Sequence, residues 1–146
     1  MSDRPEPDQA VRDSFARQSF MTTLGAALVE AGAGNVLIAY GRNEAFCQQH
    51  GYLHAGVATA IADSACGYAA LSMAPPGADV LTIEFKVNFL RPASGERFEA
   101  RGRVVKPGAQ ISVCAAEVWE TAPRRRLIVT MSATMFIAKG GAETPA

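Results

Sequence analysis

Residues 48–73 read QQHGYLHAGVATAIADSACGYAALSM, and the interpretation of the whole chain starts from this stretch. After a short polar lead-in, the segment from Ala55 to Met73 is rich in alanine and has apolar residues on nearly every side of a helix. Such a helix would be about 28 Å long at about 1.5 Å per residue. Because a helix that is apolar all round is a buried one, we predict a long helix in the protein core.

One carboxylate interrupts this predicted helix. Between Glu44 and Asp79, Asp63 is the only acidic or basic side chain apart from two histidines. A carboxylate in the middle of a buried helix is costly unless it is paired or used in chemistry. Asp63 is therefore the strongest functional candidate in the sequence, with a buried structural aspartate that caps a backbone group as the alternative.

The composition is typical of a single globular domain without affinity for nucleic acid. The chain has 146 residues, of which 49% are apolar and 19% are charged, which suits one domain with a sizeable core. Lys and Arg together number 14, as do Asp and Glu, so no basic excess indicates nucleic acid. The three cysteines are widely spaced and form no C-x-x-C pair, as in reduced thiols of a cytosolic protein.

The termini and the central helix predict a cytoplasmic protein that does not enter a membrane. The first fourteen residues are polar and lack the apolar segment of a signal peptide. An aspartate in the middle of a helix also opposes membrane insertion, by about 2.5–3.5 kcal/mol. We expect one domain over residues 9–138, with flexible tails at residues 1–8 and 139–146.

The flanking sequence predicts a sheet that covers the central helix. Four-residue apolar spacing indicates a helix over residues 9–24. An alternation of period two, interrupted by Gly- and Pro-rich turns, predicts strands over residues 27–31, 35–41, 81–90, 96–105, 110–120 and 127–137. In the strand 81–90, this alternation places Thr82 on the polar face. Long strands joined by short turns form antiparallel sheets, so the predicted fold class is α+β, with a long central helix wrapped by a curved antiparallel sheet.

The quoted motifs resemble a known family. The segment GYLHAGVATAIADSACGYAAL, followed by TIEFKVNFLRP, is similar to the hotdog-fold acyl-CoA thioesterases of the PaaI type, and the likeness extends over residues 10–138. That family has a His-Gly-Gly opening the central helix, an acidic residue nine positions after the His, and an amide six positions before it. His54, Asp63 and Gln48 match these positions. Ala55 replaces the first Gly of the pair but keeps its backbone N–H.

The resemblance implies a role for each matched residue. Asp63, supplied by a facing subunit, would activate water as a general base or attack the thioester directly. The N–H groups of Ala55 and Gly56, unpaired at the helix start, would hold the carbonyl together with the Gln48 amide. An ordinary helix start would expose the same N–H groups to water. His54 would position the carbonyl or its loop through a hydrogen bond, or would be a helix-entry histidine bonded to backbone.

Further residues are candidates for contacts outside the reacting carbonyl. Thr82 matches a family position that contacts the nucleophilic water or the carboxylate, although Thr is also simply a good strand residue. Arg91 and Lys106 could bind the phosphates of coenzyme A. The resemblance implies that pantetheine passes beside the turn that contains Lys106 and Gly108. A solvated strand face is the alternative explanation for such charges.

The sequence therefore predicts an acyl-CoA thioesterase that converts an aromatic or medium-chain acyl-CoA to the free acid and CoA. No metal or other cofactor is expected, because His50 and His54 are too few ligands for a zinc site, and coenzyme A is part of the substrate. The resemblance implies a homodimer that assembles to a homotetramer. Two other interpretations stay open, an acyl-thioester hydratase and a non-catalytic acyl-CoA-binding protein.

Overall fold

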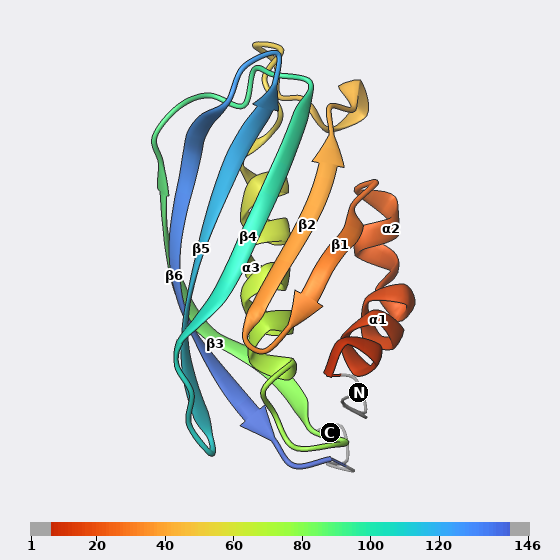
Figure 1. Cartoon of the computed structure of the whole chain (residues 1–146). Coiled ribbons are helices and arrows are strands. Elements are labelled where there is room, and N and C mark those ends of the chain that lie inside the picture. The colour runs from red at the N-terminus through yellow and green to blue at the C-terminus, as the bar shows by residue number, and fades with distance from the viewer. Residues whose placement is uncertain (1–6, 141–146) are drawn as a thin grey trace.

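Helix α3, Ala55–Leu71, lies across one face of a six-stranded antiparallel sheet and contacts all six strands. Figure 1 shows the sheet curving around this helix. This computed structural model describes residues 7–140, and of Pro7 and Asp8 only the backbone. The predicted tails at 1–8 and 139–146 therefore lie largely outside the described residues. Over the described residues the predicted fold class, a hotdog fold, is confirmed.

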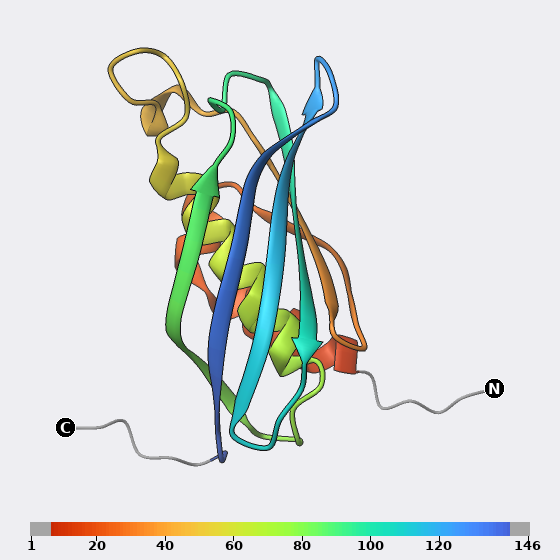
Figure 2. The ribbon, with the colours of Figure 1, turned by 90° about the vertical axis from the view of Figure 1, so that its left-hand side faces the viewer.

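The strands follow the order β1-β2-β4-β5-β6-β3 across the sheet. Figure 2 shows β3 at one edge of the sheet, beside β6. Their bounds are β1 Ala27–Gly32, β2 Asn35–Gly41, β3 Asp79–Phe89, β4 Arg97–Lys106, β5 Ile111–Ala122 and β6 Arg126–Ala138. All the strands predicted from the alternation are present, within two residues of the expected limits. Because β3 is an edge strand, its outer row of backbone groups is open to a further strand.

The N-terminal segment differs from the prediction in one respect. The single helix expected over 9–24 is two helices, α1 Pro7–Arg17 and α2 Ser19–Thr23. They meet at Gln18, whose backbone is extended, with φ −83° and ψ 93°. The two helices lie beside β1 (Figure 1), and α1 contacts both β1 and α3. A short 3-10 turn, Glu44–Phe46, follows β2.

Burial of α3 explains why the alanine-rich segment folds as a helix here. The buried residues cover most of its circumference and are Val57, Ala58, Ile61, Ala62, Ala65, Cys66, Tyr68, Ala69 and Ala70. The remaining side is partly buried and carries Asp63. Most of the buried residues are small, so the strands approach closely. At Gly102 on β4, an added Cβ would lie 2.4 Å from the backbone of Ala65. A glycine is therefore required there for helix and sheet to pack.

A bulge in β3 corrects the predicted orientation of Thr82. Thr82 and Glu84 pair with consecutive residues of β6, so Ile83 is an extra residue in β3. An extra residue exchanges the two faces of a strand. Thr82 thus pairs with the buried Met135 and faces α3, whereas the prediction placed it among the polar side chains of the opposite face. The apolar alternation continues through Ile83, so the sequence conceals the bulge.

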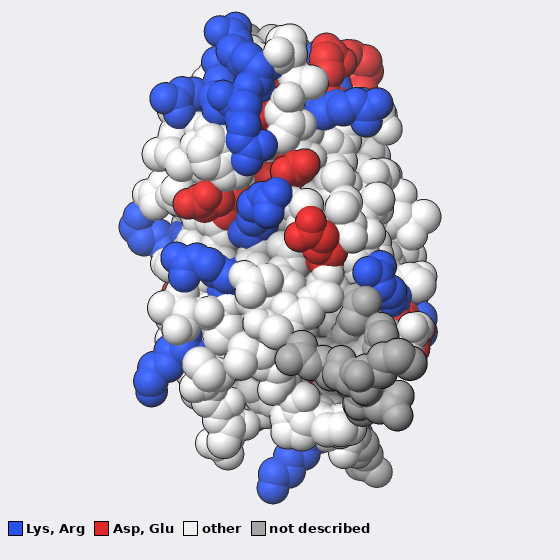
Figure 3. Space-filling view, viewed as in Figure 1, with Lys and Arg blue, Asp and Glu red and all other residues white. Residues whose placement is uncertain are grey.

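The outer face of the sheet carries most of the strand charges. Basic side chains gather toward the upper end of the face in Figure 3, with acidic side chains between them. On β4 the residues Arg101 and Glu99 pair at 3.5 Å, and the alternate residues Phe98, Ala100 and Gly102 are buried. These charges belong to a solvated strand face, remote from α3. No helix within residues 7–140 is long and apolar enough to cross a membrane.

Candidate functional site

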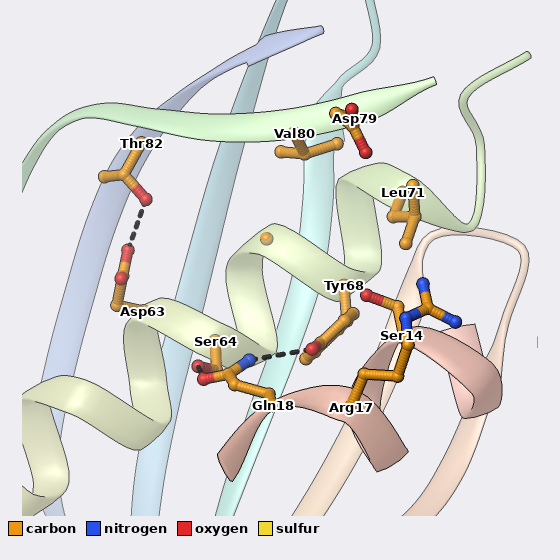
Figure 4. Close-up of a pocket in the computed structure, with 11 residues that line it drawn as sticks. Ser14, Arg17, Gln18, Asp63, Ser64, Tyr68, Leu71, Asp79, Val80 and Thr82 are labelled. Atoms are coloured by element: carbon orange, nitrogen blue, oxygen red, sulfur yellow. Dashed lines mark hydrogen bonds between the residues drawn. The ribbon is translucent and has the colours of Figure 1, made fainter. Parts of the chain in front are cut away.

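Asp63 is a half-buried carboxylate in the middle of α3, held by one hydrogen bond. The Thr82 hydroxyl donates to its Oδ1 at 2.7 Å (Figure 4). Burial raises the pKa of Asp63 above its ordinary value, and the hydrogen bond from Thr82 opposes that rise. A carboxylate whose pKa is raised is a stronger base once it has lost its proton. The bulge in β3 places Thr82 where it can orient this group.

A pocket of about 430 Å³ opens onto Asp63 between the end of α1 and β3. Figure 4 shows the side chains around it. Most of its lining is polar, from Ser14, Arg17, Gln18, Ser64, Tyr68 and Asp79, with a smaller apolar part from Leu71 and Val80. A polar, open pocket of this kind lets water reach Asp63, as general-base hydrolysis requires.

Gln18 fixes the N-terminal helices next to Asp63. Its amide nitrogen donates to the Tyr68 hydroxyl at 2.7 Å, and its amide oxygen accepts from the Ser64 hydroxyl at 3.2 Å. Ser64 directly follows Asp63, and Tyr68 lies about one turn further along α3. No pattern in the sequence points to Gln18, because its partners are 46 and 50 residues away.

The start of α3 presents one unpaired backbone N–H group. The Gly56 N–H donates to Nδ1 of His54 at 2.8 Å, so His54 caps the helix through its own side chain. Among the residues that the structure describes, the Ala55 N–H has no hydrogen-bond partner. Two free N–H groups were expected, at Ala55 and Gly56. In this geometry the Gly56 N–H is bonded to His54, and over the described part of the chain only that of Ala55 is free.

Gln48 lies beside this helix start with a free donor. Its side-chain oxygen accepts from the backbone N–H groups of His50 and of Tyr52, the latter at 3.4 Å, and closes the turn. The amide nitrogen, in this assignment of the side chain, has no partner within residues 7–140. Gln48, His54 and Ala55 all line a second pocket, of about 550 Å³. The Ala55 N–H and the Gln48 amide therefore border the same pocket.

A single subunit does not bring Asp63 to this helix start. Eight residues separate Ala55 from Asp63 on one helix, which is about 12 Å at about 1.5 Å per residue. The two groups also line different pockets. A base and a carbonyl site at this separation cannot act on the same bond.

The predicted coenzyme A contacts are separated as well. Arg91 lines the pocket at the helix start and donates to the Leu127 carbonyl at 2.7 Å. Lys106 ends β4, and Gly108 lies in the β4–β5 hairpin at the opposite end of the sheet (Figure 1). The ten residues of β4 span about 30 Å at about 3.3 Å per residue. An added Cβ at Gly108 would meet the Ile111 carbonyl oxygen at 2.1 Å, so the hairpin itself requires this glycine.

Within residues 7–140, no three His, Cys, Asp or Glu side chains are grouped so that they could hold a metal ion.

The chain is similar to known thioesterases in sequence and in structure. The family model described as "Thioesterase superfamily" matches residues 50–125. A thioesterase family protein from Silicibacter pomeroyi is 49% identical, with a TM-score of 0.89, over 92% of this chain and 99% of that one. The E. coli PaaI protein from the phenylacetic acid degradation operon is 18% identical, with a TM-score of 0.84, over 92% and 94% of the two chains. A Saccharolobus solfataricus protein that is named as an esterase is 26% identical over 113 residues, which are 77% of this chain and 80% of that one.

Proposed function

The chain belongs to the thioesterase superfamily, and on that premise we propose that it hydrolyses acyl-CoA thioesters of aromatic or medium-chain acids. The observation that carries the proposal is the half-buried carboxylate of Asp63, on an otherwise uncharged helix, held by the Thr82 hydroxyl. A thioester carbonyl is electrophilic and its thiolate leaves easily, so one activated water molecule suffices for hydrolysis.

The proposed reaction uses two groups on opposite sides of the thioester carbonyl. The Ala55 N–H and the Gln48 amide donate to the carbonyl oxygen and stabilise the negative charge that develops on it. Asp63 accepts a proton from water as the water oxygen bonds to the carbonyl carbon. The C–S bond then breaks, the proton passes to the departing thiolate, and the acid and CoA are released. Direct attack by Asp63, followed by hydrolysis of the anhydride, uses the same residues.

Two subunits are needed to assemble this site. If two α3 helices pack antiparallel about a two-fold axis near Thr59, Asp63 of each lies beside Ala55 of the other. The edge strand β3 supports such a dimer, because Leu81, Ile83, Phe85 and Phe89 are 41–59% exposed in the single chain. Exposed apolar side chains on an unpaired edge favour association. We propose a homodimer with two shared sites that assembles further to a homotetramer.

The phosphates of coenzyme A would then meet basic groups from both subunits. Arg91 lies at the carbonyl pocket, whereas Lys106 and Gly108 lie at the far end of the sheet. An antiparallel arrangement of subunits brings the far end of one toward the near end of the other. Arg91 and the Lys106–Gly108 turn of the facing subunit are therefore proposed as the coenzyme A contacts.

A spectrophotometric assay of thiol release over a panel of acyl-CoA esters tests the function. We expect thiol release from phenylacetyl-CoA, benzoyl-CoA or octanoyl-CoA. A hydratase would instead consume enoyl-CoA without releasing thiol. A non-catalytic binder would bind the esters and leave them intact, and either result would contradict the proposal.

The Thr82→Val variant is expected to shift the pH dependence of kcat/KM. The ionised form of Asp63 is the active one, so activity falls as the pH drops below the pKa of that carboxyl. The Thr82 hydroxyl stabilises the ionised form and lowers this pKa, against the effect of burial. Its removal therefore raises the pKa, and the acidic limb of the pH profile moves to higher pH. Thr82→Ser, which keeps the donor, is the control, and an unmoved acidic limb in Thr82→Val would contradict the assignment.

A further inference from the structure

We propose that the acyl group of the substrate occupies the pocket at the start of α3, and that Ala58 limits the size of the acyl group accepted there. This inference rests on the proposed thioesterase function. It adds the location of the acyl group and the residue that selects its size.

The floor of this pocket is apolar and shielded from water. It is formed by Leu53, Ala58, Ile128 and Val129, each at most 5% exposed. Side chains at the mouth are more accessible, with Tyr52 39% exposed and Phe89 and Leu90 both 49% exposed. A pocket of about 550 Å³ lies within the range of small-molecule sites, which are mostly lined by apolar and aromatic side chains. An apolar acyl group buried there leaves water, which favours binding.

The pocket at Asp63 has the opposite chemistry. Arg17 and Asp79 line it with charge, and the Gln18 amide and the Tyr68 hydroxyl add polar groups. An apolar chain placed there would take these groups out of water without offering hydrogen bonds. That pocket therefore suits water and the polar parts of a substrate, and the acyl chain is better placed at the helix start.

Ala58 stands where an acyl chain leaves the bound carbonyl. It lies three residues after Ala55, so both side chains are on the same side of α3, about 4.5 Å apart along the helix. Ala58 is buried, and the pocket lies next to its methyl group. A larger side chain here extends into the pocket and takes the space of the acyl chain beyond its first carbons. Short acyl groups would still fit.

The Ala58→Leu variant tests this inference, with kcat/KM measured for propionyl-CoA, octanoyl-CoA and phenylacetyl-CoA. We expect kcat/KM for octanoyl-CoA and phenylacetyl-CoA to fall about 10- to 100-fold relative to propionyl-CoA, since hydrophobic pockets discriminate acyl size by such factors. Ala115→Leu adds the same atoms on the outer face of β5 and is the matched control, with an unchanged ratio. Circular dichroism verifies that both variants are folded.

Leu90→Ala provides a second test that adds no atoms to the core. Loss of the exposed side chain at the mouth should lower kcat/KM for octanoyl-CoA about 3- to 10-fold while leaving propionyl-CoA nearly unchanged. This variant decides the outcome if Ala58→Leu does not fold. An unchanged ratio of octanoyl-CoA to propionyl-CoA in the folded variants overturns the placement of the acyl group.

Two other outcomes are distinct. An equal loss for every ester in Ala58→Leu would show that the pocket takes the pantetheine arm, and the inference would be wrong although the thioesterase function stands. If the unmodified protein releases thiol from none of the esters, the proposed function itself fails, and the acyl pocket fails with it.

Discussion

Asp63→Asn is expected to lower kcat for thioester hydrolysis by about 100- to 10,000-fold, the range for loss of a general acid or base. Asparagine keeps the size of the side chain, and its amide oxygen can still accept the Thr82 hydrogen bond. It cannot remove a proton from water or attack the carbonyl. The fold should be unaffected, because a costly half-buried charge is replaced by a neutral group.

Asp79→Asn is the matched control for that experiment. Asp79 lines the same pocket but is exposed and lies at the start of β3. It should retain turnover close to that of the unmodified protein. Near-normal turnover in a folded Asp63→Asn protein would show that the base lies elsewhere, and the proposed mechanism would be abandoned.

The second large effect is expected at Gln48. Loss of a donor to a developing oxyanion lowers kcat by about 100- to 1,000-fold, so Gln48→Ala should fall in this range. Alanine also removes the oxygen that closes the turn to Tyr52. Gln48→Glu separates the two roles, since it keeps an accepting oxygen and loses the N–H donor. It should be as inactive as Gln48→Ala.

Gln49→Ala is the control for Gln48, because the neighbouring amide lines the same pocket. It should leave kcat within about threefold of the unmodified value, as expected for an exposed side chain without a role in the transition state. If Gln48→Ala and Gln48→Glu turn over as fast as Gln49→Ala, the carbonyl oxygen is not held by this amide.

The sequence predicts the central helix from the length and apolar character of one segment, and it predicts the strands from their apolar period. The alanine-rich segment has apolar residues on every side, and the strands alternate with period two. Asp63 stands out for a related reason, as the one charge within an apolar segment. Its hydrogen bond to Thr82 was not predictable in its geometry, because the bulge at Ile83 leaves the apolar alternation intact.

The remaining differences come from contacts between distant parts of the chain. The Gln18 hydrogen bonds join residues far apart in sequence, and nothing local marks them. Similarly, Arg91 follows the end of β3 and Lys106 ends β4. These two strands run in opposite directions, so the two residues lie at opposite ends of the sheet. The capping of Gly56 by His54 depends on a side-chain rotamer that the motif does not specify.

Subunit mixing tests most directly whether Asp63 and the Ala55–Gln48 carbonyl site come from different subunits. Purified Asp63→Asn and Gln48→Ala proteins, each nearly inactive, are mixed in equal amounts, allowed to exchange subunits, and assayed for thiol release. In a shared site, half of the dimers are mixed and each mixed dimer has one intact site, so about a quarter of the unmodified activity should return. Mass spectrometry of the native assembly verifies that mixed dimers have formed. If they form and activity does not return, Asp63 and the Ala55–Gln48 site do not act together across the interface, and the shared site is wrong.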